Sequence, residues 1–417
     1  MSSEISILAE NAREASRALP ALSTAKKNRA LLAMADALEA ARKTILNANA
    51  LDLEVGRDAG LPDALLDRLA LTESRFNSMV AGVRHVAALP DPVDKRVGKK
   101  QKLPNGLTLE KRRAPIGVIA IIYESRPNVT ADAAALCVKA SSAVILRGGK
   151  ESVHSNRAIA AAMAAGGEAA GLPRNALQLV QTTDRAAVGE LVQMDACVDL
   201  VIPRGGESLI RAVVEQSRVP VLKHYKGVCH IFVNKDADLA RALPLIENAK
   251  CQRPAVCNAV ETVLVHKAVA KKFLPQLGSL AQRRGIILRA DAATRKIIPA
   301  AEPAADDDWF AEYGNLTLAV RVVANVNAAI GHINQYGSHH SDAILTAKEG
   351  DARRFLKNVD SAAVYVNAST RFTDGGEFGM GAEMGISTDK FHARGPVGLE
   401  ELTTYKYLVR GDYAARA

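Results

Sequence analysis

Residues 117–150, GVIAIIYESRPNVTADAAALCVKASSAVILRGGK, contain the pattern that decides the fold. The run at 117–123 is apolar almost throughout, which is typical of a strand buried on both faces of a sheet. A helical stretch at 130–140 separates it from a second apolar run at 143–147. Two buried strands joined by a helix form the right-handed crossover unit of a parallel sheet. The stretch therefore predicts an α/β fold.

The same alternation of strands and helices continues toward the carboxyl end. The strand-like runs lie at 176–180, 197–202 and 220–223, and, after His224, at 229–234, 261–266, 285–290, 316–324, 342–347 and 361–368. A chain of 417 residues exceeds the size that one hydrophobic core supports. We therefore expect two α/β domains, each with a parallel sheet covered by helices.

The regions outside this alternation predict a helical amino-terminal segment and a hairpin. Residues 4–90 are expected to be helical, because apolar residues recur at intervals of three and four, as in LLAMADALEAARKTILNA at 31–48. Residues 91–113 are polar and contain Pro-Asn-Gly at 104–106, a hairpin turn signal. The end of the chain, 399–411, predicts a last strand. Such an arm is suited to pairing with another subunit.

Composition and charge exclude several classes of protein. With 48% hydrophobic and 24% charged residues, the chain is typical of a globular enzyme. The formal net charge of +9 is compatible with nucleic acid or with anionic small ligands, but only short basic blocks occur and no nucleic-acid module is present. No run reaches the roughly 18 apolar residues of a membrane helix, and no secretory signal opens the chain. Five cysteines, an odd number, are not a disulfide framework, which predicts a reduced, cytoplasmic protein.

The segment CQRPAVCNAVETVLV at 251–265 holds two of these cysteines. A zinc site usually needs a second close pair of ligands, and none follows, so we expect no metal. Cys137, Cys197 and Cys229 lie in or beside apolar runs and are expected to be small buried hydrophobes. Cys257 instead follows a loop, where backbone N–H groups favour a thiolate. It is either a nucleophile or a further buried thiol.

Two strand ends carry paired glycines. They are Arg147-Gly148-Gly149-Lys150 and Arg204-Gly205-Gly206-Glu207, each between a strand and a helix. Glycine lets backbone N–H groups approach a phosphate, and a helix N-terminus favours its negative charge. The adjacent basic residues suit the phosphorylated ribose of NADP. The alternative is that both pairs only serve turns.

Two polar stretches are further candidates. Asn128 follows the first strand and either caps the next helix or donates its amide into a cleft. The stretch VYVNASTRFTDGGEFGMGAE at 364–383 either is a surface loop or holds a polar small molecule at the carboxyl end of a strand.

Taken together, these stretches resemble the gamma-glutamyl phosphate reductase family, also called glutamate-5-semialdehyde dehydrogenases, within the aldehyde dehydrogenase superfamily. The likeness covers essentially the whole chain. Its most specific parts are IIYESRPNVT (121–130), AVILRGGKE (143–151), IPRGGESLI (202–210), LKHYKGVCHIFV (222–233), QRPAVCNAVET (252–262), HHSDAILT (339–346), AVYVNASTRFTDGGEFGMGAEMGIST (363–388) and HARGPVGLEELTTYK (392–406).

The resemblance implies an organisation into functional domains. A cofactor-binding domain is expected at 1–95 and 115–226, and a catalytic domain at 227–388. A hairpin-based oligomerisation element is expected at 96–114 with 389–417. A homo-oligomer is the implied assembly.

The resemblance also implies roles for individual residues. Cys257 matches the nucleophile, and Asn128 matches the asparagine whose amide helps to hold the oxyanion. The cofactor-binding positions that it implies are Arg147, Gly148, Gly149, Lys150, Gly205, Gly206 and Glu312. For the α-carboxylate and α-ammonium of the substrate, the candidates are Thr370, Arg371 and Asp374, the alternative being that Arg371 and Asp374 only form an ion pair within the loop.

One departure from the superfamily pattern bears on the reaction. Hydrolytic members carry a glutamate base in an E-L-G-G-K segment, and the matching segment here is His224-Tyr225-Lys226-Gly227. Without that carboxylate, water is not activated against a thioester, which is then available for reduction. The basic replacements suit a phosphate leaving group.

The expected function is NADPH-dependent reduction of L-glutamyl 5-phosphate to L-glutamate 5-semialdehyde through a cysteine thioester, the second step of proline biosynthesis. Glutamate 5-kinase, which makes the labile acyl phosphate, is a possible partner, and neither nucleic acid nor membrane is expected as one. The rival interpretations are a hydrolytic aldehyde dehydrogenase and a basic binding protein on an inactive dehydrogenase scaffold.

Overall fold

The computed structural model describes residues 3–416, which form two compact units. Unit 1 comprises the described residues up to Lys223 together with Met380–Gly385 and the residues from Val397 onward. Unit 2 comprises His224–Gly379 and Ile386–Pro396. The expected element at 389–417 is thus divided between the two units.

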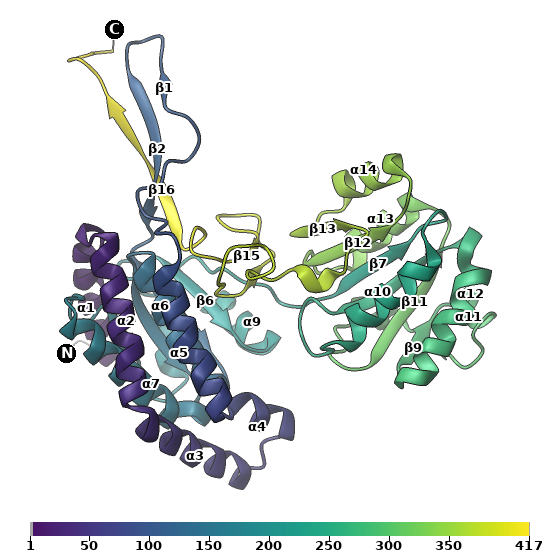
Figure 1. Cartoon of the computed structure of the whole chain (residues 1–417), viewed down its shortest axis with the longest axis horizontal. Helices are drawn as coiled ribbons and strands as arrows, with labels where there is room; N and C mark the ends of the chain where they lie inside the picture. Colours follow the sequence, from purple (N-terminus) through teal and green to yellow (C-terminus); the bar gives the residue numbers. More distant parts are fainter. Residues whose placement is uncertain (1–2, 417) are drawn as a thin grey trace. The chain divides into compact units, whose positions relative to one another are not determined.

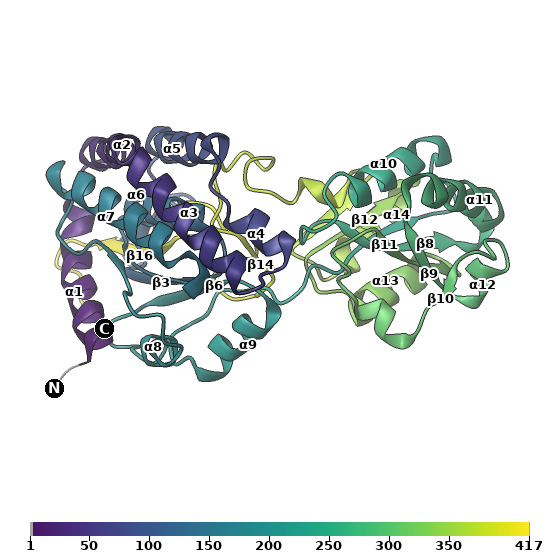
Figure 2. The same ribbon diagram turned by 90° about the horizontal axis from the view of Figure 1, so that it is seen from below.

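Unit 1 is built on a four-stranded parallel sheet with the strand order β5-β4-β3-β6. Its strands are β3 (Val118–Tyr123), β4 (Ala143–Gly148), β5 (Leu177–Leu179) and β6 (Leu200–Arg204). Every residue of β3 is buried, as its uninterrupted apolar run predicts. Figure 2 shows α6 (Pro127–Lys139) and α7 (Val153–Ala169) on one side of this sheet, with α8 (Ala186–Leu191) and α9 (Glu207–Gln216) on the other. The predicted α/β architecture is confirmed.

The amino-terminal helices include three that form a second layer over the sheet helices and one, the first, that packs directly against the strands. They are α1 (Glu4–Ala18), η1 (Leu19–Ala21), α2 (Thr24–Ala40), α3 (Arg42–Asp58), α4 (Asp63–Leu69) and α5 (Glu73–Ala88). Helix α2 packs against α5, α6 and α7, and buries Leu31, Met34 and Leu38. These three residues follow the spacing of three and four on which the prediction of helix rested.

A three-stranded antiparallel sheet also belongs to unit 1. It consists of β1 (Gln101–Lys102), β2 (Thr108–Pro115) and β16 (Thr403–Arg410), with β2 in the centre. The turn between β1 and β2 contains Gly106 at a φ of 83°, which only glycine adopts without strain. Figure 1 shows β2 and β16 side by side. The predicted hairpin and last strand are both present.

Unit 2 contains a seven-stranded parallel sheet with the order β10-β9-β11-β8-β7-β12-β13. The strands are β7 (Cys229–Val233), β8 (Val260–His266), β9 (Ile287–Ala290), β10 (Glu302–Pro303), β11 (Thr317–Val323), β12 (Ser341–Leu345) and β13 (Ala363–Val366). A small antiparallel pair, β14 (Ile386–Ser387) and β15 (Gly395–Pro396), also belongs to this unit.

Helices cover both faces of the unit 2 sheet. Alternate residues of a strand point to opposite faces, and each face has its own core. Ile231 joins the core under α10 (Leu239–Cys251) and α11 (Lys267–Arg284), whereas Phe232 joins the core under α13 (Val326–Tyr336) and α14 (Glu349–Asn358). The remaining short helices are η2 (Lys150–Ser152), α12 (Ala292–Arg295), η3 (Asp306–Phe310) and η4 (Thr370–Phe372).

Two strand boundaries differ from the prediction. The run at 220–223 forms only an isolated bridge between Val221 and Val201, so it is not a fifth strand of the unit 1 sheet. The strand expected at 197–202 begins at Leu200, because the Asp199 carboxylate accepts the N–H of Val118 at 2.8 Å and pairs with Arg13. Among residues 3–416, no helix combines the length and apolar character that crossing a membrane requires.

Candidate active site

Cys257 lies in the turn that leads into β8. The hydrogen bond from the Ala259 N–H to the Val256 carbonyl closes this turn at 3.0 Å. Helix α10 ends at Cys251, so the thiol lies at a tight turn and not at a helix start. Cys257 is partly exposed, as a nucleophile must be to meet a substrate.

Two residues next to β7 contact the backbone of Cys257: Gly227, which precedes the strand, and Cys229, which is its first residue. A Cβ at Gly227 would lie 2.0 Å from the Cys257 carbonyl oxygen, so only glycine fits there. The Cys229 thiol donates to the same oxygen at 3.3 Å. Burial raises the pKa of the Cys229 thiol well above its ordinary value, which keeps it protonated as a donor.

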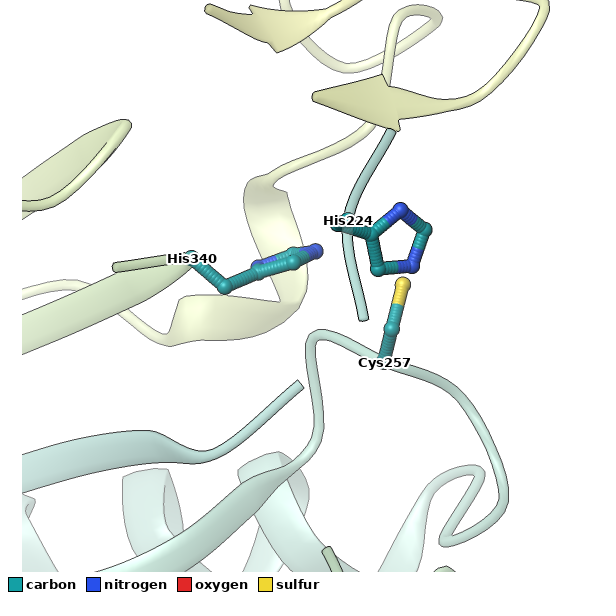
Figure 3. Close-up of side chains that lie close together, drawn as sticks. All are labelled: His224, Cys257 and His340. Atoms are coloured by element: carbon teal, nitrogen blue, oxygen red, sulfur yellow. The ribbon is translucent and has the colours of Figure 1, made fainter. Parts of the chain in front are cut away.

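Two imidazoles lie next to the thiol. The side chains of His224, Cys257 and His340 each offer an atom, nitrogen or sulfur, within 4.8 Å of the others. In Figure 3 a ring nitrogen of His224 faces the Cys257 sulfur, and the ring of His340 points toward that of His224. The two rings meet edge to face, with centroids 5.6 Å apart.

Each imidazole is oriented by a hydrogen bond at its Nδ1 atom. The Nδ1–H of His224 donates to the Ile386 carbonyl oxygen at 2.8 Å. His340 Nδ1 bonds the Ser341 hydroxyl at 2.9 Å, and the His340 side chain is fully buried. In each ring, the second nitrogen, Nε2, therefore points away from the Nδ1 partner, which is Ile386 for His224 and Ser341 for His340.

The loop after β13 contacts the same turn. Asn367, with a φ of 55°, reverses the chain after the strand. Thr370 is fully buried, and its hydroxyl donates to the Asn258 carbonyl oxygen at 2.7 Å. Arg371 donates to the Asn258 side-chain oxygen and, through Nε, to Gln252 at 3.2 Å.

The third substrate candidate in this loop, Asp374, is oriented by its own backbone. Its carboxylate accepts the N–H of Gly376 at 2.8 Å. Arg371 and Thr370 therefore reach the residue next to Cys257, whereas Asp374 shapes the loop beyond them.

These contacts show which strand ends the stretch at 364–383 approaches. The sequence left two alternatives open, a surface loop or a binding loop at the carboxyl end of a strand. Cys257 and His340, however, precede their strands. The loop reaches them by turning back toward the amino ends of the strands. The strand order β8-β7-β12 brings the segments before these three strands together.

Asn128 lies in the first turn of α6 in unit 1. The N-cap of α6 is Arg126, so Asn128 does not cap the helix. Its exposed side chain donates to Asp132 at 2.9 Å. Burial raises the pKa of Asp132 to about 6, although the Asn128 donor and Arg204 both favour its ionised form.

The first glycine loop follows β4. Gly148 ends the strand, and a Cβ there would lie 2.0 Å from the Asn156 side-chain nitrogen. Gly149 precedes η2, in which Lys150 is exposed. The sequence placed these residues correctly between a strand and a helix.

Arg147, at the end of the same strand, is largely buried. Its Nη atoms donate to the carbonyl oxygens of Gly148, Thr183 and Asp184 at 3.0–3.1 Å. Burial lowers the pKa of its guanidinium group. Arg147 thus fixes the path of the loop at 183–184.

The second glycine loop leads into α9. Gly206 is the N-cap residue, and its N–H donates to the Glu124 carboxylate at 2.9 Å. A Cβ at Gly205 would lie 2.4 Å from the same carboxylate. The helix N-terminus thus already holds an anionic oxygen, which is the chemistry of a phosphate site.

Glu312 is exposed in the loop between η3 and β11. Burial raises the pKa of Glu261 to about 7, and the charge of Glu312 adds to this rise. The Glu261 carboxylate accepts the Gly314 N–H at 3.3 Å. Glu261 also forms a fully buried ion pair with Lys250, 2.5 Å apart. That pair joins the end of α10 to the start of β8, on either side of the Cys257 loop.

Sequence reasoning did not single out His340, Gly227 or Asn258. His340 lies in HHSDAILT directly before a buried strand. The pair of histidines at the start of an apolar run is the feature of the sequence that could have identified it. Gly227 and Asn258 act through backbone contacts with residues distant in the chain, which spacing alone does not reveal.

Comparisons with known proteins agree with this geometry. Residues 2–286 match the model of the aldehyde dehydrogenase family. The gamma-glutamyl phosphate reductase of Moorella thermoacetica is 53% identical over 409 residues, which cover 98% of each chain. The crystal structure of the Thermotoga maritima gamma-glutamyl phosphate reductase is 45% identical, covers both chains fully and superposes with a TM-score of 0.98. That of the Saccharomyces cerevisiae enzyme is 34% identical, with full coverage of both chains and a TM-score of 0.56. The chain is therefore an oxidoreductase of the aldehyde dehydrogenase family and belongs to its gamma-glutamyl phosphate reductases.

Proposed function

We propose that this chain reduces L-glutamyl 5-phosphate to L-glutamate 5-semialdehyde and phosphate, with NADPH as reductant and Cys257 as nucleophile. This is the second step of proline biosynthesis from glutamate. The observation that carries the proposal is the Cys257 turn. A partly exposed thiol lies close to two imidazoles, and position 224 holds a histidine in place of a glutamate. The names of the relatives support the substrate.

The first half of the reaction takes place at the Cys257 sulfur. The thiol gives up its proton, and the thiolate attacks the acyl carbon of the substrate. A carbon–sulfur bond forms, the bond between that carbon and the phosphate oxygen breaks, and phosphate leaves. His224 adds no carboxylate that would activate water, so the thioester survives until it is reduced.

The second half is a two-electron reduction of the thioester. When bound, the nicotinamide cofactor supplies the hydride. The Asn128 amide and a backbone N–H near Cys257 hold the oxyanion that results. Reprotonation of the sulfur and cleavage of the carbon–sulfur bond release the aldehyde and the free thiol.

The residues of unit 1 fit a dinucleotide. The Gly206 N–H already binds a carboxylate oxygen at the N-terminus of α9, and a pyrophosphate oxygen has the same requirement. A Cβ at Gly148 would clash with the Asn156 side chain and one at Gly205 with the Glu124 carboxylate, so both loops require glycine. Lys150, which is exposed, and Arg147, which is largely buried, are proposed to meet the ribose phosphate that distinguishes NADP. Glu312, which belongs to unit 2, is proposed to bind the nicotinamide ribose.

Arg371 is proposed to bind the α-carboxylate of the substrate. Its guanidinium group lies beside Asn258, the residue that follows the nucleophile. Thr370 holds the backbone of Asn258, and Asp374 is proposed to meet the α-ammonium group.

The cellular compartment, the assembly and the partner of this enzyme are also proposals. The five cysteines are free, which suits a reducing cytoplasm. The sheet β1-β2-β16 exposes Tyr405, Tyr407 and Val409 and is the proposed contact in a homo-oligomer. A complex with glutamate 5-kinase would shield the labile acyl phosphate.

The test is reduction of NADP⁺ by L-glutamate 5-semialdehyde with and without phosphate. The proposal requires phosphate-dependent turnover, whereas a hydrolytic aldehyde dehydrogenase turns over without phosphate and forms the acid. Cys257→Ser should retain less than about 1% of the activity, because a hydroxyl is the weaker nucleophile. Cys251→Ser is the matched control and should be mild. Normal turnover by Cys257→Ser, or salt-sensitive DNA binding without any turnover, would contradict the proposal.

A further inference from the structure

We propose that His224, Cys257 and His340 form a three-ligand site for a divalent cation of borderline softness, with Zn²⁺ as the representative ion. Two imidazoles and one thiolate are the ligand set that zinc prefers among first-row metals. The binding of the cation does not depend on the reaction proposed above. Its consequence, the masking of the nucleophile, rests on Cys257 acting as that nucleophile.

The spacing of the three ligand atoms is close to what a tetrahedral ion needs. The atoms lie within 4.8 Å of one another. Bonds of about 2.0–2.1 Å to nitrogen and about 2.3 Å to sulfur place tetrahedral ligand atoms roughly 3.4–3.6 Å apart. On binding, the distance between any two ligand atoms must therefore shorten by at most about 1.4 Å, the difference between 4.8 Å and the lower tetrahedral separation of about 3.4 Å.

The three side chains divide into one fixed ligand and two adjustable ones. His340 is fully buried at the start of β12 and cannot move far. His224 and Cys257 are only partly buried, so rotation about their side-chain bonds can supply the closing movement. A site of this kind combines a rigid anchor with ligands that adapt to the ion.

A second-sphere contact holds the His224 ring in the required tautomer, and another orients the His340 ring. A histidine that binds a metal usually donates its other N–H to a backbone carbonyl or another oxygen. His224 does so through Nδ1 to Ile386, and His340 bonds the Ser341 hydroxyl through Nδ1. In Figure 3 the nitrogen of His224 that faces the sulfur is the one remote from the backbone, Nε2.

Binding the cation removes the thiol proton, which passes to the solvent, and ties up the sulfur lone pair. A metal-bound sulfur does not attack an acyl carbon at the rate of a free thiolate. Three protein ligands leave a fourth position open for water or an anion such as phosphate. The result is a reversible block of the nucleophile.

The experiment uses the whole purified chain, stripped of metal with EDTA and titrated with Co²⁺ as a spectroscopic probe and with Zn²⁺. We expect one Co²⁺ per chain with a thiolate-to-cobalt charge-transfer absorption in the near ultraviolet. His224→Gln should weaken binding by about tenfold or more, and Cys257→Ser should abolish the charge-transfer absorption. Cys251→Ser is the control and should retain both.

Zn²⁺ should also slow alkylation of Cys257 by iodoacetamide and inhibit turnover, with EDTA restoring both. A missing charge-transfer absorption, or equal affinity of His224→Gln and the unchanged protein, would overturn the site. If the absorption is present but saturating Zn²⁺ leaves turnover unaffected, the cation site stands and the role of Cys257 as nucleophile fails. Because His224 is partly exposed, its substitution should preserve folding, which circular dichroism checks.

Discussion

Gly227→Ala should displace the nucleophile without touching its side chain. The new Cβ would lie 2.0 Å from the Cys257 carbonyl oxygen, 2.5 Å from its Cα atom and 2.6 Å from its carbonyl carbon. Ordinary contact begins at 3.4 Å, so the backbone of Cys257 must move by about 1.4 Å, the difference from 2.0 Å. All three neighbours are backbone atoms, so no side-chain rotation relieves the clash.

The expected effect is a fall in kcat of about 100-fold, because a displacement of about 1 Å can lower a reaction rate by that factor. Overpacking should also lower the free energy of unfolding by about 1–3 kcal/mol. The assays are phosphate-dependent reduction of NADP⁺ by L-glutamate 5-semialdehyde, the rate of Cys257 alkylation by iodoacetamide, and thermal unfolding. Activity is measured well below the Tm of the variant, so that loss of folding does not imitate loss of catalysis.

Gly331→Ala is the matched control. Gly331 lies within α13, and a Cβ there meets nothing within 4 Å. Its kcat should be unchanged, and its stability should rise by about 0.5–1 kcal/mol, because alanine is the better helix former. If Gly227→Ala has the same kcat and the same thiol reactivity as this control, the Cys257 backbone is not displaced and the prediction is wrong.

Three further predictions concern the cofactor loop, the buried ion pair and pH. Arg147→Ala should raise the KM for NADPH more than that for NADH, and equal effects would remove its role at the ribose phosphate. Lys250→Met alone should lower the free energy of unfolding by about 3–5 kcal/mol in chemical denaturation, because it leaves Glu261 buried without its partner. The double substitution Lys250→Met with Glu261→Leu should be near neutral. A double variant as unstable as the single one would contradict this prediction. Because the folded-state pKa of Asp132 is raised from 3.8 to about 6, its protonated form stabilises the fold below about pH 4, and this contribution is lost as the pH rises through 6. Asp132→Asn should therefore be less stable relative to the unchanged protein at pH 4 than at pH 7, and a constant difference across this range would rule out the shifted pKa.

The strands and helices were largely readable from the sequence because their signals are local. The uninterrupted apolar run at 117–123 corresponds to β3, and the helical stretch expected at 130–140 overlaps α6. Strand ends were less well determined. The start of β6 depends on the Asp199 carboxylate, which bonds a residue 81 positions away in the sequence.

Some features of the candidate site were likewise readable from the local sequence, whereas others depended on tertiary contacts. The sequence by itself singled out Cys257, since a cysteine between a loop and a strand differs from one within an apolar run. It also placed both glycine pairs between a strand and a helix, because each pair immediately follows an apolar run. Roles that depend on contacts, such as those of Arg147 and Thr370, needed the structure: both side chains are largely buried and hold backbone atoms.

Only the tertiary structure brought His224 and His340 to the thiol. Ligand spacing in a sequence reveals only ligands that are close in the chain, and these three residues belong to separate segments. They meet because β7 lies between β8 and β12 in a parallel sheet, so the segments that precede the three strands converge at one edge. Strand order is decided by how the two faces of the sheet are buried by their helices, and no local pattern encodes it.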